Sequence, residues 1–196
     1  KKKIEHMKTL KWDDASLDER VATGEEIAFC RDMIKRELPT RSNLQLKAPD
    51  ITFQQKMEID LGEITCIVEH VGGEHAEDSS IIYIPEEKVM FLGDCIYQDF
   101  YSGKWSYDLD KLNLLLDKIK KYDANYYVTG HQAPKMKEEM WNVLHEIVRI
   151  GELVDDEVNV EKAVESFRHE RGVAPNEEQL EFIQHFINGN EKKEKK

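Results

Sequence analysis

The stretch Ser80-Ile-Ile-Tyr-Ile-Pro-Glu-Glu-Lys-Val-Met-Phe-Leu-Gly-Asp94 decides the fold of this chain. Two apolar runs, residues 81–84 and 89–92, flank a short segment that begins with Pro85, and this pattern predicts a β-hairpin. Because polar residues hardly interrupt either run, we expect strands that are covered on both faces, as in a layered sandwich.

The register of this hairpin brings two candidate ligands together. If Ile84 pairs near Val89, antiparallel pairing places Ser79 beside Asp94. His75 precedes Ser79 by four residues, so the chain can bring His75 close to Asp94. No similar argument places the third candidate, His131.

Three predicted strands share one kind of ending. Each leads through glycine to a histidine or an aspartate, in Gly72-Gly-Glu-His75, Gly93-Asp94 and Gly130-His131. Glycine permits a sharp turn at the end of a strand, where a side chain can point into a cleft. Imidazole and carboxylate groups are the usual ligands of zinc or iron, so His75, Asp94 and His131 are the candidate metal ligands.

These motifs resemble the second half of the metallo-β-lactamase superfamily. The similar stretch runs from Pro49 to Gln132, somewhat under half of the chain, and ends in Val128-Thr-Gly-His131. Each motif alone is common, and their order, strand context and spacing together make the resemblance specific. It implies an α/β fold of the α+β type, part of an αβ/βα four-layer sandwich with added C-terminal helices.

The resemblance also implies roles for the three candidates. His75 would complete a three-histidine metal site, Asp94 would bridge two metals, and His131 would belong to the second site. The cofactor would be two zinc ions, with iron or manganese as alternatives. A metal-bound hydroxide, supported by Asp94 as the catalytic residue, would attack an ester, thioester or lactam-like bond of a small-molecule substrate.

One family motif is absent from this chain. Family members carry His-x-His-x-Asp-His upstream, whereas this chain contains no His-x-His and begins at Lys1 instead of Met. We therefore expect an N-terminally truncated form that is inactive alone. Without the N-terminal half of the sandwich, it should expose apolar sheet surface.

Residues 1–151 are expected to form the C-terminal portion of the metallo-β-lactamase-like domain. Residues 152–196 are expected to form a helical extension with a disordered, charged tail. Capping signals at Ser16-Leu-Asp-Glu19 and Thr23-Gly-Glu-Glu26 predict two helix starts. The hydrophobic periodicity predicts further strands at 50–59, 64–70 and 126–129, and helices at 25–38, 108–121, 137–150, 160–168 and 176–187.

The composition argues against several partners and compartments. A net charge of −12 disfavours nucleic acid and anionic membranes as the main partner, and no apolar run is long enough to span a bilayer. The three cysteines are widely spaced and form no Cys-x-x-Cys, so a reducing cytoplasm fits best. We expect a small-molecule substrate and allow for a homo-oligomer.

Several alternatives stay open at this stage. His70 is nearest in sequence to His75, although its place at a strand end favours a structural role. The aromatic loop over residues 99–107 either shapes a substrate pocket or packs as a lid. Two other functions compete with hydrolysis: a non-catalytic binding or assembly domain that uses the C-terminal helices, and a di-iron redox protein.

Overall fold

The computed structural model describes residues 2–194, and for residues 2 and 3 it describes the backbone only. The chain forms two compact units, Lys1–Thr52 and Phe53–Lys196. This division differs from the boundary expected after residue 151. The helices beyond that residue share the second unit with the sheet, because Phe167, Ile183 and Phe186 belong to its hydrophobic core.

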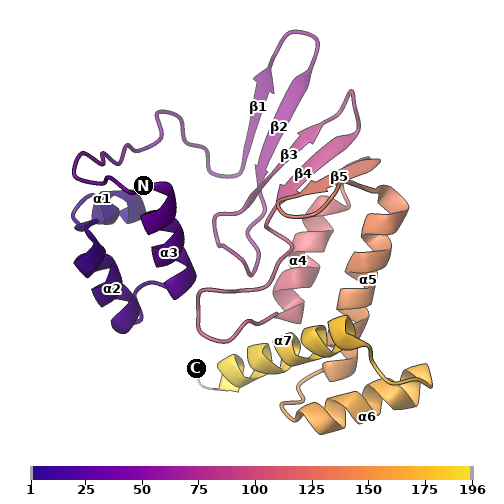
Figure 1. Cartoon of the computed structure of the whole chain (residues 1–196). Helices are drawn as coiled ribbons and strands as arrows, with labels where there is room; N and C mark the ends of the chain where they lie inside the picture. The colour runs from indigo at the N-terminus through magenta and orange to yellow at the C-terminus, as the bar shows by residue number, and fades with distance from the viewer. Residues whose placement is uncertain (1, 195–196) are drawn as a thin grey trace. The chain divides into compact units, whose positions relative to one another are not determined.

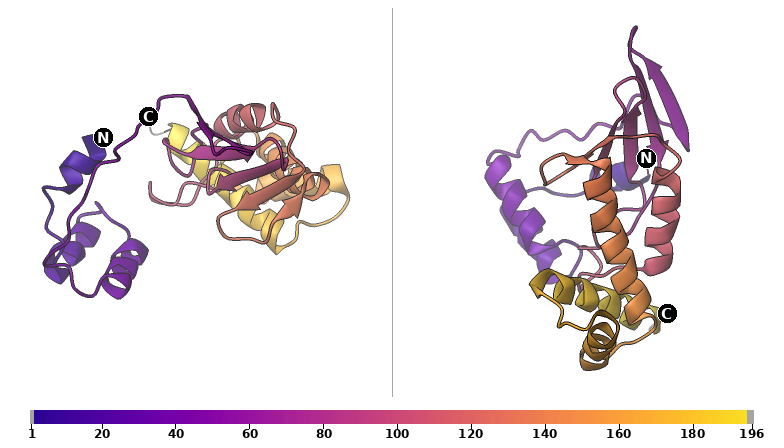
Figure 2. Two further views of the ribbon diagram at one scale, coloured as in Figure 1. Left: turned by 90° about the horizontal axis from the view of Figure 1, so that it is seen from above. Right: turned by 90° about the vertical axis from the view of Figure 1, so that its right-hand side faces the viewer.

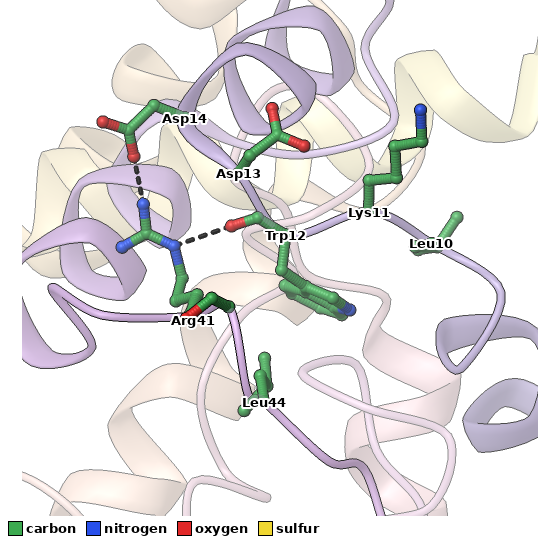
Figure 3. Close-up of a pocket in the computed structure, with 8 residues that line it drawn as sticks. Leu10, Lys11, Trp12, Asp13, Asp14, Arg41 and Leu44 are labelled. Atoms are coloured by element: carbon green, nitrogen blue, oxygen red, sulfur yellow. Dashed lines mark hydrogen bonds and ion pairs between the residues drawn. The ribbon is translucent and has the colours of Figure 1, made fainter.

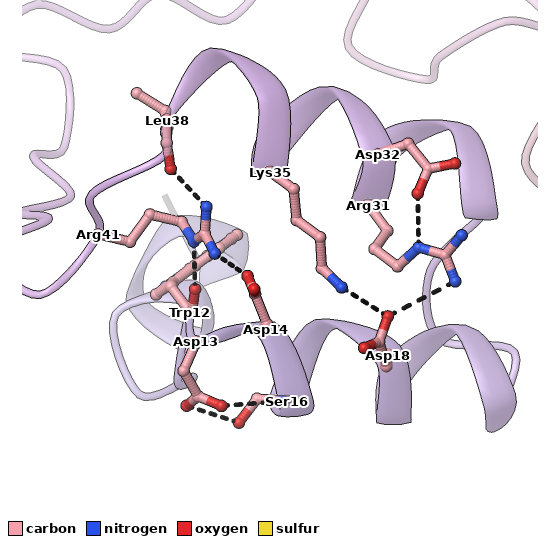
Figure 4. Close-up of polar contacts among 10 residues, drawn as sticks. All are labelled: Trp12, Asp13, Asp14, Ser16, Asp18, Arg31, Asp32, Lys35, Leu38 and Arg41. Carbon is pink, nitrogen blue, oxygen red and sulfur yellow. Dashed lines mark hydrogen bonds and ion pairs between the residues drawn. The ribbon is translucent and has the colours of Figure 1, made fainter.

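The first unit consists of α1 (Lys2–Met7), α2 (Asp14–Ala22) and α3 (Ala28–Glu37). Polar contacts join α2 to α3, since Arg31 and Lys35 both reach Asp18 (Figure 4). The predicted caps were wrong. Asp13, not Ser16, caps α2 by accepting from the Ser16 N–H, and α3 begins after Ile27 without a side-chain cap.

Arg41 links the segment after α3 to the start of α2 in the first unit. Its Nε donates to the Trp12 carbonyl oxygen at 2.7 Å, and its guanidinium pairs with Asp14 (Figures 3 and 4). The Arg41 side chain is only 8% exposed, whereas the Asp14 side chain is 68% exposed, so solvent screens this ion pair from the Asp14 side. The cavity beside it, of about 590 Å³, is lined by Leu10, Trp12 and Leu44 among others (Figure 3).

The second unit is built on one mixed sheet with strand order β1-β2-β3-β4-β5-β6. All neighbouring strands are antiparallel except β4 and β5, which are parallel. The hairpin register is confirmed, because Ile84 pairs with Val89 and Ile82 with Phe91. The strands are β1 (Lys56–Asp60), β2 (Thr65–His70), β3 (Ser80–Ile84), β4 (Val89–Gly93), β5 (Tyr126–Thr129) and β6 (Lys135–Met136).

Helices pack on one face of this sheet. Inward residues such as Ile81, Met90 and Tyr127 are at most 1% exposed and join the helices in one core. Figure 1 shows α4 and α5 beside the sheet, with α6 and α7 near the far end of α5. The side view in Figure 2 shows the same arrangement. These helices are α4 (Leu109–Ile119), α5 (Lys137–Val154), α6 (Val160–Arg171) and α7 (Glu177–Glu194).

The opposite face of the sheet is apolar and partly exposed. Ile82 and its cross-strand neighbour Phe91 are 37% and 42% exposed, and Ile59 on β1 is 38% exposed. The expectation that the strands are covered on both faces is therefore wrong within this unit. The apolar sheet surface expected of half a sandwich is present. Cross-strand pairing extends the same face to Met57, Cys66, Val68, Ile84, Val89, Tyr126 and Val128.

The predicted α/β class, with helices added after the last strand, is confirmed. Several bounds differ from the prediction. The strand expected at 50–59 covers only Lys56–Asp60, and α7 continues through Glu194, where a disordered tail was expected. Lys195 and Lys196 of that tail lie outside the described residues. Among the residues that the structure describes, no helix combines the length and apolar character needed to cross a membrane.

Helix α7 approaches the backbone of the aromatic loop closely at Gly189. An added Cβ at this position would lie 1.9 Å from the Tyr107 carbonyl oxygen. Alanine normally stabilises a helix interior relative to glycine by about 1 kcal/mol. Here we expect Gly189→Ala to lower the free energy of unfolding by about 1–3 kcal/mol, because backbone must move to admit the methyl group. Urea unfolding followed by circular dichroism measures this.

Ser166→Ala, at an exposed position inside α6, is the matched control. It should change stability by at most about 0.5 kcal/mol. A Gly189→Ala protein at least as stable as the parent would contradict the close approach of α7 to the loop.

Candidate metal centre

The ends of β4 and β5 place two of the three candidate ligands side by side. Because these strands are parallel, their carboxyl ends lie at the same edge of the sheet, and Asp94 and His131 each follow one of them. The Gly130 N–H donates to the Gly93 carbonyl oxygen at 2.9 Å, which continues the pairing beyond the strands. His131 Nε2 lies 3.4 Å from Asp94 Oδ1.

His75 reaches the same point from the loop between β2 and β3. This loop is pinched at its base, where the Val71 and Gly72 N–H groups both donate to the Ser79 carbonyl oxygen. Since β3 starts where β4 ends, the loop lies next to Asp94. His75 Nε2 lies 3.7 Å from Asp94 Oδ2. The structure therefore brings all three candidates together around one carboxylate.

The tautomer of His75 follows from its second nitrogen. Nδ1 lies 3.3 Å from the Gln98 carbonyl oxygen, which can only accept a hydrogen bond, so the proton belongs on Nδ1. Nε2 faces Asp94 Oδ2 and can bind a metal when the ring is neutral. A backbone carbonyl that orients an imidazole in this way is typical of metal-ligating histidines.

The distances suit ions that lie between these atoms. Two donors at about 2.1 Å from one tetrahedral zinc ion are about 3.4 Å apart. The separations of 3.4 and 3.7 Å are close to this value and longer than a normal hydrogen bond. Each carboxylate oxygen faces a different imidazole.

Asp94 Oδ1 is buried and has no hydrogen-bond partner among the described residues. A buried carboxylate oxygen without a partner is costly, and a cation next to it would remove that cost. Space around the oxygen is tight, because a Cβ added at Gly130 would lie 2.0 Å from it. The donors present therefore fit a metal, as part of its ligand set.

The set is incomplete within this chain. Across residues 2–194, no group of three or more His, Cys, Asp or Glu side chains is positioned to hold one ion. At each of the two separations only one imidazole and one carboxylate oxygen come together, so further donors would be needed to hold an ion. Cys95 does not extend the set. Its burial, assisted by the Asp94 charge, raises the pKa of the thiol to about 12 and keeps it neutral.

Aromatic side chains that the motifs did not indicate contact both histidines, although the His131 side chain stays 72% exposed whereas that of His75 is 13% exposed. The Phe100 and Tyr101 rings meet His75 edge-on, with centroids 5.3 and 5.6 Å away. The Tyr97 ring stacks on His131 at 5.7 Å. The loop over residues 99–107 thus contacts His75 directly, and Tyr97, just before that loop, contacts His131. Only its position after Asp94 could have indicated this from the sequence.

The other candidates in this region are structural. His70 Nε2 lies 2.8 Å from the Glu77 carbonyl oxygen, consistent with the structural role favoured for it. Glu74, the residue before His75, has only 9% of its side chain exposed and pairs with Lys111 at 2.9 Å. This pair ties the loop that carries His75 to α4.

The comparisons with known proteins were made on sequence and on structure. No family model matches the sequence, and no curated protein matches it. Similar solved structures do exist. Their titles name a flavodiiron protein, a metallo-β-lactamase and a sec-alkylsulfatase.

These neighbours are metallo-β-lactamase-fold proteins. The metallo-β-lactamase from Pontibacter korlensis is 21% identical, with 69% of this chain and 65% of that chain covered and a TM-score of 0.41. The flavodiiron protein from Giardia intestinalis is 16% identical (49% and 29% covered, TM-score 0.40). The sec-alkylsulfatase Pisa1 from Pseudomonas sp. is 14% identical (73% and 24% covered, TM-score 0.46).

The matched region spans from about a quarter to two thirds of those proteins' own length. At these TM-scores the likeness is no basis for assigning a reaction. The neighbours are of the kind that the motifs resemble, and the residues around Asp94 carry the functional interpretation.

Asp99 anchors the aromatic loop that holds His75. Its Oδ1 accepts from the Tyr101 and Ser102 N–H groups at 2.8 and 3.1 Å, and its Oδ2 accepts from Lys192 Nζ at 3.1 Å. Burial by itself would raise the pKa of Asp99. The hydrogen bonds from Ser102, Tyr101 and Lys192 outweigh burial, and the pKa lies below its usual value.

We expect Asp99→Asn to lower the free energy of unfolding at pH 7 by about 1–3 kcal/mol, because Lys192 loses its partner. The lowered pKa of Asp99 means that its contribution is complete above about pH 4, the unfolded-state value, and is lost as the pH falls through the folded-state value. Urea unfolding at several pH values should show the difference from the parent shrinking below pH 4.

Asp117→Asn is the control, because Asp117 pairs with Lys120 on the surface of α4 with 60% of its side chain exposed. It should change stability little at any pH. A stability difference for Asp99→Asn that is constant with pH would contradict the role given to the Asp99 charge.

Proposed function

We propose that this chain forms part of a metal-dependent hydrolase that opens an ester, thioester or lactam-like bond of a small molecule. The observation that supports this most is the placement of Asp94, whose two oxygens face two different imidazoles at 3.7 and 3.4 Å. A carboxylate shared in this way suits a site for two metals. Two-metal sites serve hydrolysis by clamping both the attacking and the leaving oxygen.

Bound metals would polarise the scissile bond and make a water molecule nucleophilic at neutral pH. The residues of this chain would hold the metals and orient the histidine ligands. Asp94 would contact both ions, His75 one of them and His131 the other. The Gln98 carbonyl keeps the His75 proton on Nδ1, and the aromatic rings of Phe100 and Tyr101 limit the access of water to the His75 side chain, which is 13% exposed.

The remaining ligands would come from polypeptide other than residues 2–194. We expect the segment that supplies them to cover the apolar face around Ile82 and Phe91 as well. The incomplete ligand set and the exposed apolar face both belong to the same sheet. Without that segment, metal affinity should be weak and hydrolysis absent. In this proposal the chain seen here is inactive alone.

Zinc is the proposed cofactor, because the donors are imidazole and carboxylate and hydrolysis needs no redox change. Stoichiometric iron in the purified protein would favour redox chemistry instead. We place the protein in the cytoplasm, a proposal that the free cysteines Cys30, Cys66 and Cys95 support. A homo-oligomer stays a prediction.

Zinc titration of the full chain tests the proposal. We expect weak zinc binding by calorimetry, together with shifts of the His75 and His131 ring signals in NMR spectra. Asp94→Ala should abolish both, because it removes the only group that contacts both positions. Gly130→Ala keeps every ligand but displaces Asp94 Oδ1, so it should weaken zinc binding by about 10–100-fold.

Asp117→Ala, which removes an exposed aspartate far from the motif loops in sequence, should bind zinc like the parent. Circular dichroism would verify that each variant is folded. Equal zinc binding by the parent and a folded Asp94→Ala protein would rule out the proposed centre.

A further inference from the structure

A cavity of about 360 Å³ lies next to His131 in the second unit. Three parts of the chain enclose it: the segment after Asp94, the start of α5, and α7. Most of its lining is apolar, including Ile96, Phe100, Met140, Val143, Ile147 and Phe182. A cavity at the lower end of the 300–1,000 Å³ range of ligand pockets suits part of a small molecule and excludes a folded polymer.

The cavity is continuous with the candidate metal centre. His131 and Tyr97 both line it, and their rings stack on each other. The imidazole of His131 faces Asp94 with its Nε2. A group held in the cavity is therefore adjacent to the carboxylate around which the three candidate ligands meet.

The polar groups of the lining are few and balanced in charge. Lys135, with 18% of its side chain exposed, lies 3.7 Å from Glu139, and Glu178 lines the cavity from α7. The buried Tyr97 hydroxyl has no hydrogen-bond partner among the described residues. A charged ligand would gain no net attraction here, whereas an apolar one would gain from its burial.

We propose that this cavity binds the apolar acyl arm of the substrate, a carboxylic ester or thioester, and that Phe182 and Val143 limit the length of that arm. This inference rests on the proposed hydrolase function and names its substrate class. It also gives the C-terminal helices a part in substrate selection, because Phe182 and Glu178 belong to α7.

Binding of unreactive amides to the full chain, without added metal, tests this directly. A series from butanamide to octanamide presents the carbonyl and the alkyl arm of such an ester. We expect each added methylene to tighten binding about fourfold until the cavity is full. NMR titration should show shifts confined to residues that line the cavity.

Two variants and one control decide the outcome. Val143→Phe fills the cavity and should abolish the chain-length dependence, whereas Phe182→Leu enlarges it and should move the optimum to a longer amide. Val173→Phe, the same change at a position 63% exposed and outside the cavity, should bind like the parent. If Val143→Phe does not fold, the optimum of Phe182→Leu decides alone.

The proposal is overturned if the parent binds none of the amides, or if folded Val143→Phe or Phe182→Leu shows the parent's chain-length preference. These results are independent of metal. Amide binding without zinc binding would leave the cavity assigned and reject the hydrolase, and zinc binding without amide binding would do the reverse.

Discussion

The parallel pairing of β4 with β5 is the constraint on which the rest of the site depends. Any two strands can each end in a glycine and a ligand, but only parallel neighbours deliver both endings to one edge of a sheet. The pairing continues through the Gly130 N–H to the Gly93 carbonyl oxygen, and the absence of a side chain at Gly130 leaves room for Asp94. The position of the carboxylate is thus fixed by backbone.

A second constraint reaches the site from the far end of the chain. Helix α7 holds the aromatic loop through the His185 carbonyl oxygen, which accepts from the Tyr107 N–H, and through Asn188, which donates to the Trp105 carbonyl oxygen. Gln98, whose carbonyl orients His75, directly precedes this loop. The helices after residue 151 are therefore part of the structure that positions a ligand and lines its neighbouring cavity, not an appendage to it.

The sequence predicted what depends on local pattern. The hairpin register and the approach of His75 to Asp94 follow from apolar alternation and turn length, and both are present. The sequence could not place His131, because parallel pairing is a long-range contact without a local signal. It also missed the Asp13 cap, since Ser16 offered a competing motif, and the Tyr97 and Gln98 contacts, which join residues far apart in the sequence.

The pattern of unsatisfied groups singles out this edge of the sheet without reference to any family. Among the buried side-chain polar atoms of the described residues that lack a hydrogen bond, three belong to Asp94, Tyr97 and Thr129. A chain in which nearly all buried polar groups are hydrogen-bonded has no structural reason to leave such atoms together, because each unpaired atom costs folding free energy. Unpaired buried polar groups are typical of ligand-binding sites, because the bound ligand supplies the missing hydrogen-bond partners. The Asp94 carboxylate would be stabilised by a cation, and the Tyr97 hydroxyl can donate a hydrogen bond to an acceptor. A metal ion would supply the first partner, and the carbonyl oxygen of a substrate would supply the second.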